Sequence, residues 1–179
     1  PLSVLAHHAC MVGKQETLFV SGFVRNLVAS LARTVPRFAA LLAEDGSAVA
    51  SLSEQRCRSN PVAVLLRVMQ LLQKSGPPRA GVHCIVIDSL DESLLTSQAQ
   101  SVAATLGDER VINALPAWLR IIATSRPDDR VLKNFCFPLS SVHYINVKSD
   151  SAQADIVRFL AAHEDHFLKK EPSLSTADL

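Results

Sequence analysis

The chain has 179 residues, a formal net charge of +1 and 48% hydrophobic residues. This length suits one domain of ordinary size. Its 18 basic and 17 acidic residues give no electrostatic reason to expect nucleic acid or an anionic membrane as a partner. No apolar run approaches the roughly 18 residues that a membrane span needs. The four cysteines form no Cys-x-x-Cys pair, so we expect free, buried thiols and a cytoplasmic location.

The first third of the chain predicts a strand followed by helices. Residues 3–10 form an apolar run that is typical of a strand. Residues 18–34 have the apolar period of an amphipathic helix, which Pro36 ends. Residues 44–60 are polar and predict a loop with at most one short helical turn.

Asn60 and Pro61 predict the start of a second long helix, because they supply a capping side chain and then a proline at the first helical position. Gly76 followed by two prolines ends it. The predicted apolar stripe of this helix consists of Val62, Leu65, Leu66, Met69 and Leu72.

Three short runs rich in β-branched residues predict strands: Val82–Ile87, Leu119–Thr124 and Val142–Val147. The first of them is almost continuously apolar, which predicts a strand covered on both faces in a parallel sheet. We expect helices over 97–106 and 109–117 between the strands. Strands that alternate with helices predict an α/β fold with a parallel sheet, whose ligands bind beyond the carboxyl ends of the strands.

A final helix is predicted after Asp150, since Asp150 and Gln153 have the spacing of a capping box. Its predicted apolar face consists of Ile156, Phe159, Leu160 and His163.

Polar clusters follow two of the predicted strands, and the first contains three acids. Asp88 stands where a hard cation could bind, and Ser89 is small enough for a phosphate to approach. Asp91 and Glu92 are placed to orient or deprotonate a water molecule. The alternative is that Asp88 caps the strand and the other two acids begin a solvated helix. Arg126, after the next strand, is either directed at phosphate or an ordinary loop arginine.

These residues carry a resemblance to a known family. The string from Ile85 to Glu92 resembles the Walker B motif of NACHT-type (STAND) P-loop NTPases, and that from Ile121 to Pro127 resembles their sensor strand. The subgroup with ankyrin and tetratricopeptide repeats, the TANC-type scaffolds, is similar in three further strings, namely Val4–Cys10, Phe23–Leu31 and Leu115–Leu119.

The resemblance implies a partial P-loop NTPase fold of the ASCE type. Residues 3–165 would belong to the NTPase core and 166–179 to a polar tail or linker. The motif Gly-x-x-x-x-Gly-Lys-Ser/Thr is not present: Gly13-Lys14 is the only Gly-Lys pair, and Gln15 follows it. Since the family orders its strands 5-1-4-3-2, the chain is expected to enter at the second strand. The first, P-loop strand would be missing.

The resemblance also implies a function and roles. Asp88 would hold Mg²⁺, Ser89 and Arg126 would contact ATP, and Asp91 and Glu92 would be catalytic. The expected activity is an ATP-dependent conformational switch that controls assembly, with ATP or ADP and other protein chains, including further copies of the same protein, as partners. The alternative is an interaction scaffold whose NTPase fold is catalytically inert. Slow ATP hydrolysis would belong to the complete domain.

Overall fold

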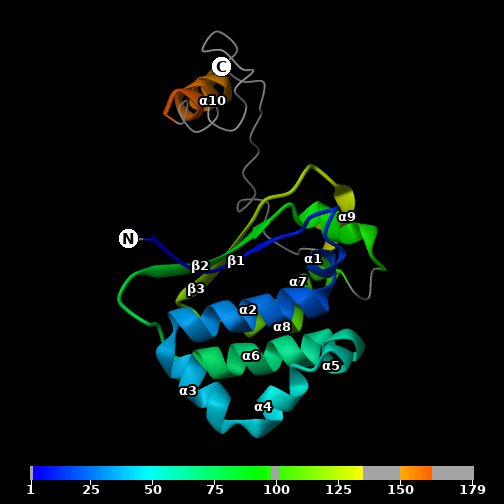
Figure 1. Ribbon diagram of the computed structural model, residues 1–179, viewed down its shortest axis with the longest axis vertical. Coiled ribbons are helices and arrows are strands. Elements are labelled where there is room, and N and C mark those ends of the chain that lie inside the picture. The colour runs from blue at the N-terminus through cyan, green and yellow to red at the C-terminus, as the bar shows by residue number, and fades with distance from the viewer. Residues whose placement is uncertain (1, 98–100, 135–149, 163–179) are drawn as a thin grey trace. The chain divides into compact units, whose positions relative to one another are not determined.

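The computed structural model describes residues 2–97, 101–134 and 150–162 (Figure 1). The chain divides into two compact units, Pro1–Cys136 and Phe137–Leu179. Among the described residues, no helix is both long and apolar enough to cross a membrane.

The first unit contains a three-stranded sheet in the order β1-β2-β3. Its strands are β1 (Leu2–Ala9), β2 (Val82–Asp88) and β3 (Leu119–Ala123), and both neighbouring pairs are parallel. The α/β fold with a parallel sheet is therefore confirmed, as are three of the predicted strands. The fourth, predicted over 142–147, lies outside the described residues.

The connection from β1 to β2 is helical. Its helices are α1 (Gln15–Leu18), α2 (Val20–Thr34), α3 (Pro36–Glu44), α4 (Gly46–Ser51), α5 (Glu54–Ser59) and α6 (Pro61–Ser75). The apolar face predicted for the first long helix is buried in α2, where Phe23 and Leu31 are 1% and 0% exposed. Pro36 ends the predicted helix and also begins α3, in which it occupies the first turn.

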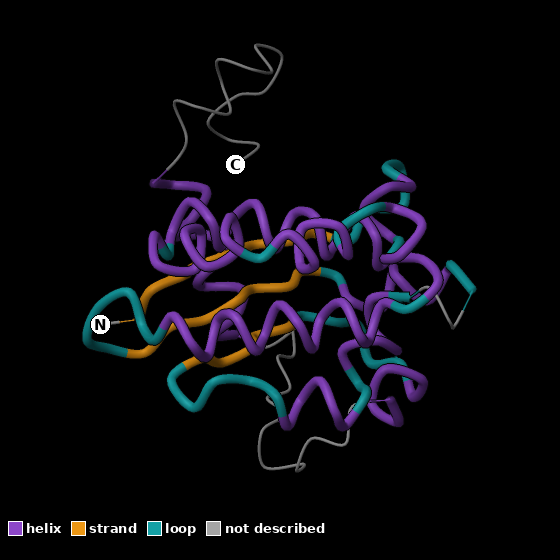
Figure 2. The backbone as a smooth tube through the Cα atoms, turned by 90° about the horizontal axis from the view of Figure 1, so that it is seen from below, coloured by secondary structure: helices purple, strands orange, loops and turns teal. Residues whose placement is uncertain are grey.

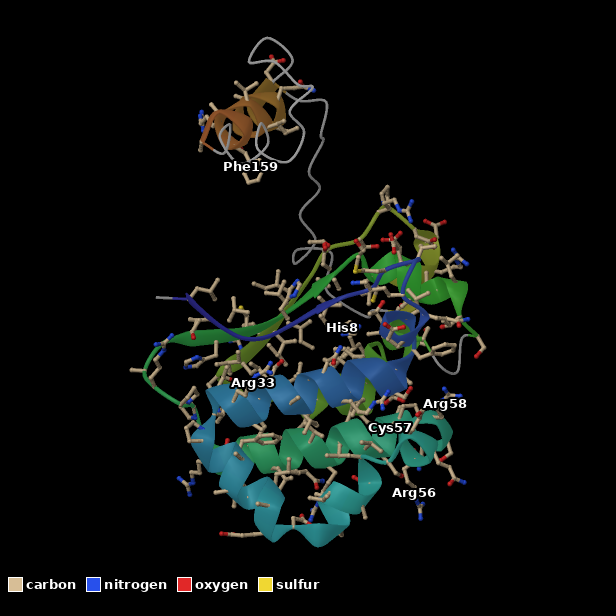
Figure 3. All side chains as sticks on the ribbon, viewed as in Figure 1. His8, Arg33, Arg56, Cys57, Arg58 and Phe159 are labelled. Atoms are coloured by element: carbon tan, nitrogen blue, oxygen red, sulfur yellow. The ribbon has the colours of Figure 1, made fainter. Side chains whose placement is uncertain are left out.

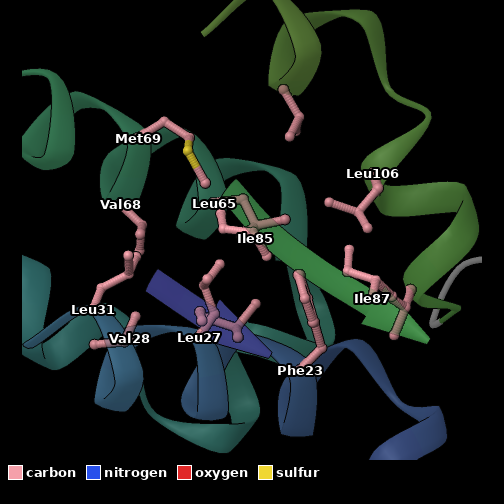
Figure 4. Packing of buried hydrophobic residues seen from close by; sticks show 14 of the residues in the cluster. Phe23, Leu27, Val28, Leu31, Leu65, Val68, Met69, Ile85, Ile87 and Leu106 are labelled. Atoms are coloured by element: carbon pink, nitrogen blue, oxygen red, sulfur yellow. The ribbon is translucent and has the colours of Figure 1, made fainter. Parts of the chain in front are cut away.

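Helix α6 begins and ends as its sequence predicts. The Asn60 side chain accepts a hydrogen bond from the backbone N–H of Ala63, and Gly76 ends the helix with φ of 68°. The buried face is rotated relative to the predicted stripe, because Val62 and Leu66 are only half-buried. The buried apolar residues are Val64, Leu65, Val68, Met69, Leu71 and Leu72, and several of them meet α2 and β2 in the core (Figure 4).

The predicted loop over 44–60 is wrong, because α4 and α5 occupy most of it. Asp45 caps α4 by accepting a hydrogen bond from the Ala48 backbone. The Cys57 side chain anchors α5 in the core with 0% exposure. A few buried contacts therefore stabilise helices whose own sequences are mostly polar.

The connection from β2 to β3 is shorter. It contains the 3-10 helix η1 (Leu90–Leu95), α7 (Val102–Leu106) and α8 (Glu109–Asn113), and α9 (Asp129–Asn134) follows β3. The helix predicted over 97–106 is shorter in the structure, where Ser101 caps its described part by accepting from Ala104. The helix predicted over 109–117 ends at Asn113.

Helices cover one face of the sheet, whereas the other face is exposed at several positions. Helices α2 and α6 lie on the same side of the strands (Figures 1 and 2). On the opposite face Val4, Val82 and Ile122 are 53%, 52% and 42% exposed. The prediction of cover on both faces concerned β2, and it holds in the middle of that strand, because the consecutive residues Cys84 and Ile85 point to opposite faces and are 0% and 1% exposed. Both connections advance in the same direction along the sheet, and successive right-handed crossovers of this kind place their helices on one face.

The second unit contains α10 (Asp150–Ala162), which confirms the predicted final helix. Its predicted apolar face is not buried where the structure describes it, since Ile156 and Phe159 are 49% and 55% exposed. The Leu160 side chain and His163 lie outside the described residues.

Two glycines make a matched test of the packing of α1 against α2. A Cβ on Gly22 would lie 1.8 Å from the backbone oxygen of Glu16, whereas a Cβ on Gly46 would meet nothing within 4 Å. We expect Gly22→Ala to lower the free energy of unfolding by about 1–3 kcal/mol, the cost of overpacking. Gly46→Ala should instead raise it by about 0.4–1 kcal/mol. Denaturant titration measures both, and equal changes in the two variants would contradict the close approach.

Candidate functional site

The two predicted polar clusters meet at one edge of the sheet. Because β2 and β3 are parallel, their carboxyl ends lie together, and the loops that follow them line an open hollow of about 430 Å³. The lining residues are Ser89, Asp91, Glu92, Thr124, Ser125 and Arg126. Asp88 ends β2 next to this hollow. The structure thus brings together every site residue that the sequence predicts, while their chemical roles stay predictions.

Thr124 connects the ends of the two strands. Its hydroxyl donates to Oδ1 of Asp88 at 2.5 Å and accepts from the backbone N–H of Ser89 at 3.0 Å. Ser89 has a left-handed backbone with φ of 55°, which is uncommon for a residue other than glycine. The threonine therefore orients the Asp88 carboxylate and also stabilises the turn that follows it. The sequence prediction missed Thr124, although it stands directly before Ser125 in the sensor-like string.

Asp91 and Arg126 form a salt bridge in the hollow. Oδ1 of Asp91 accepts from the backbone N–H of Arg126 at 3.0 Å, and Oδ2 accepts from its Nε at 2.7 Å. The aspartate side chain is 7% exposed and the arginine side chain 76%. Burial alone would raise the pKa of Asp91, but the hydrogen bonds and charge of Arg126 lower it below its ordinary value.

Glu92 is held from the other side of the site. Its Oε2 accepts from the backbone N–H of Val12 at 2.8 Å, in the loop that follows β1. In the same loop Cys10 donates its N–H to the Asp88 backbone oxygen at 3.0 Å. Burial, followed by the nearby carboxylates, raises the pKa of the Cys10 thiol to about 12. Cys10 is therefore a protonated, unreactive thiol at neutral pH, as its apolar sequence predicts.

His8 belongs to the core rather than to the site. It points from β1 towards α2, where its ring meets Phe23 edge-on (Figure 3), and its Nε2 pairs with the backbone oxygen of Thr17 in α1 at 2.8 Å. Burial is the main effect that lowers its pKa, which favours the neutral form of the ring. It has a structural role between the strand and the helix.

The carboxylates do not form a metal cage of their own. In the described part of the chain, no group of three or more His, Cys, Asp or Glu side chains is arranged to hold a metal ion. Asp88 uses Oδ1 for Thr124, and within the described segments its other oxygen accepts no hydrogen bond, so a cation could bind it. One carboxylate fits Mg²⁺ in the way that it commonly binds nucleotides, with phosphate oxygens and water as the remaining ligands. A metal site made of protein alone does not fit.

The fold and the site define the structural class of the protein. It is an α/β protein with a parallel sheet and a charged hollow at the carboxyl ends of two strands. The model of one protein family, described as nephrocystin 3, N-terminal, matches residues 3–126. The chain belongs to this family, and the matched region ends at Arg126. No curated protein matches the chain, and neither does a solved structure.

Thr124 offers a test of how the turn after β2 is held. We expect Thr124→Val to lower the free energy of unfolding by about 1 kcal/mol, since the valine is isosteric but offers neither hydrogen bond. Exchange of the Ser89 amide hydrogen should become faster. Thr124→Ser keeps the hydroxyl and should retain slow exchange. Hydrogen exchange followed by NMR checks this, and unchanged Ser89 protection in Thr124→Val would contradict it.

Proposed function

We propose that this chain supplies the cation-binding and γ-phosphate-binding half of a Mg-ATP site in a NACHT-like STAND protein, close to the TANC-type scaffolds. In this proposal ATP drives a conformational switch that controls assembly with other protein chains in the cytoplasm. One observation carries it: Asp88 ends β2 next to the hollow, Arg126 lines the hollow after β3, and each is held by a residue that follows the other strand.

The sheet supports the family part of the proposal. Its order β1-β2-β3 matches the run 2-3-4 of the order that the resemblance implies. Among the described strands, β3 pairs only with β2. The edge of β3 is where the P-loop strand would pair. The 179 residues contain no phosphate-binding Gly-x-x-x-x-Gly-Lys-Ser/Thr sequence, so the proposal assigns that loop to residues outside this chain.

Each residue of the site would then have a separate role in binding Mg-ATP. Bound Mg²⁺ would neutralise charge on the terminal phosphates. Asp88, oriented by Thr124, would hold the cation through its second oxygen. Ser89 would allow close approach, and Arg126 would donate its terminal N–H groups to the γ-phosphate. Glu92 is placed to orient a water molecule through the oxygen that Val12 does not use.

An inert interaction scaffold is the second candidate, and one observation favours it. Both oxygens of Asp91 and one oxygen of Glu92 already accept hydrogen bonds from the protein. Such hydrogen bonds are equally expected of carboxylates that only stabilise the fold and take no part in catalysis. In that case the hollow would bind nucleotide without hydrolysis, or bind none.

Two carboxylate variants separate binding from turnover. In the natural protein at its full length, we expect Asp88→Asn to weaken Mg²⁺-dependent ATP binding, since the amide still accepts from Thr124 but has no charge for the cation. Glu92→Gln should leave binding unchanged and slow hydrolysis by about 10²–10⁴-fold. Calorimetry and phosphate release measure the two effects. Turnover equal to wild type in Glu92→Gln would remove the glutamate from catalysis and favour the scaffold.

Arg126 tests the γ-phosphate contact. In the natural full-length protein, Arg126→Ala should lower ATP affinity by about 1.5–3 kcal/mol, the scale of a charged hydrogen bond, and leave ADP affinity nearly unchanged. Calorimetric titration of both nucleotides checks this. Equal losses for ATP and ADP would make Arg126 a general structural residue. If the wild type does not bind Mg-ATP, the proposed function fails.

A further inference from the structure

We infer that Asp91 is a positioning residue that holds Arg126 for the terminal phosphate, and that this contact sets the preference of the site for ATP over ADP. The inference rests on the proposed function and deepens it, because it changes the role of one acid. Asp91 then acts through Arg126 and does not itself activate water.

The contact fixes Arg126 at two separate points. Oδ1 of Asp91 binds the arginine's backbone N–H, and Oδ2 binds Nε near the end of the side chain. A planar guanidinium that is held at Nε has a defined plane and direction. Among the described residues its two terminal nitrogens make no hydrogen bond, and such a fork matches two phosphate oxygens. The arginine can therefore keep Asp91 while it binds phosphate.

Asp91 is a firm anchor because the turn that carries it is buried. The neighbouring Leu90 and Ser93 are 1% and 0% exposed. Ser93 donates its hydroxyl to the Leu90 backbone oxygen and accepts from the Ala103 N–H at 3.1 Å. Leu90 in turn donates its N–H to the Thr124 backbone oxygen at 2.9 Å, which connects this turn to the strand that precedes Arg126.

The surroundings of Arg126 show why it needs such an anchor. Its side chain is 76% exposed, and in the described residues Asp91 is its only salt-bridge partner. A free arginine on the surface samples many rotamers, and a ligand that binds it must pay the entropy of ordering them. With Asp91 in place, most of this ordering precedes binding.

The same geometry argues against Asp91 as a general base. A base must accept a proton from a water molecule through an oxygen with a free lone pair directed at that water. Each Asp91 oxygen already accepts from Arg126, and protonation would weaken the ion pair. Glu92, with one oxygen not bound by Val12, remains the acid better placed for water.

A double-mutant cycle on the natural full-length protein tests the inference. The variants are Asp91→Asn, Arg126→Ala, the double variant and the control Asp108→Asn. Asp108 holds the backbone N–H and Nε of Arg110 in a similar way, but neither residue lines the hollow. Calorimetry measures ATP and ADP binding by each protein.

We expect Asp91→Asn to reduce ATP affinity about tenfold, or about 1.4 kcal/mol, and to change ADP affinity little. In the Arg126→Ala background the same substitution should have no further effect on ATP affinity, because the arginine through which Asp91 acts is already absent. Asp108→Asn should match wild type. Additive losses of Asp91→Asn and Arg126→Ala, or equal losses for both nucleotides, would overturn the inference.

A measurement without nucleotide separates this inference from the proposed function. In protein labelled with ¹⁵N-arginine, the Nε–H signal of Arg126, assigned by its loss in Arg126→Ala, should exchange slowly in wild type and fast in Asp91→Asn. If Arg126→Ala weakens ATP binding but Asp91→Asn does not, only the inference fails. If wild type binds no Mg-ATP, both fail. If Asp91→Asn does not fold, Arg126→Lys replaces it in the test. A lysine ammonium cannot bind Asp91 and phosphate at the same time in the way that the forked guanidinium does. The preference of the Arg126→Lys protein for ATP over ADP should therefore fall as well.

Discussion

The parallel pairing of β2 with β3 is the constraint on which the site depends. It places Ile87 opposite Ala123, and backbone hydrogen bonds continue past the strands, from Thr124 to Ile87 and from Leu90 to Thr124. The loops after the two strands are therefore tied together for another turn. Only in this way do Asp91 and Arg126, 35 residues apart in sequence, come within hydrogen-bond distance. Antiparallel pairing of the same strands would place these loops at opposite ends of the sheet.

The two strand ends hold each other's functional groups. Thr124, from the β3 side, orients Asp88 of β2, while Asp91, from the β2 side, orients Arg126 after β3. Neither group is positioned by its own strand alone. A small displacement of one strand end would therefore disturb the candidate cation residue and the candidate phosphate residue together. Such reciprocal support is what a site needs if bound ligand is to act on the conformation of the loops, because a ligand shifts an equilibrium only through contacts that differ between its states.

The sequence predicts those parts of the structure that depend on local patterns. The strands follow from short β-branched runs, and α6 follows from Asn60 and Pro61 with Gly76 at its end. The helices over 44–60 could not be predicted, because α5 depends on burial of Cys57 by distant residues. In the site, the charged residues were visible in the sequence, but their partners were not. Val12 contributes a backbone N–H, which any residue except proline would offer, and the Asp91–Arg126 pair exists only through strand pairing.

The arrangement of charge in the hollow limits which ligand it suits. Asp88, Asp91 and Glu92 gather around one arginine, so the carboxylates outnumber the cation. A bare phosphate would gain from Arg126 but be repelled by Asp88 and Glu92. A bare cation would meet one oxygen each of Asp88 and Glu92 that accepts no hydrogen bond from the described residues, but Arg126 would repel it. A complex of a divalent cation with phosphate has charge of both signs, and it can place the cation near Asp88 and phosphate oxygens near Arg126. Because Asp91 already pairs with Arg126, its negative charge repels the phosphate of such a ligand only weakly. This balance of charge favours a metal–phosphate complex over either ion alone.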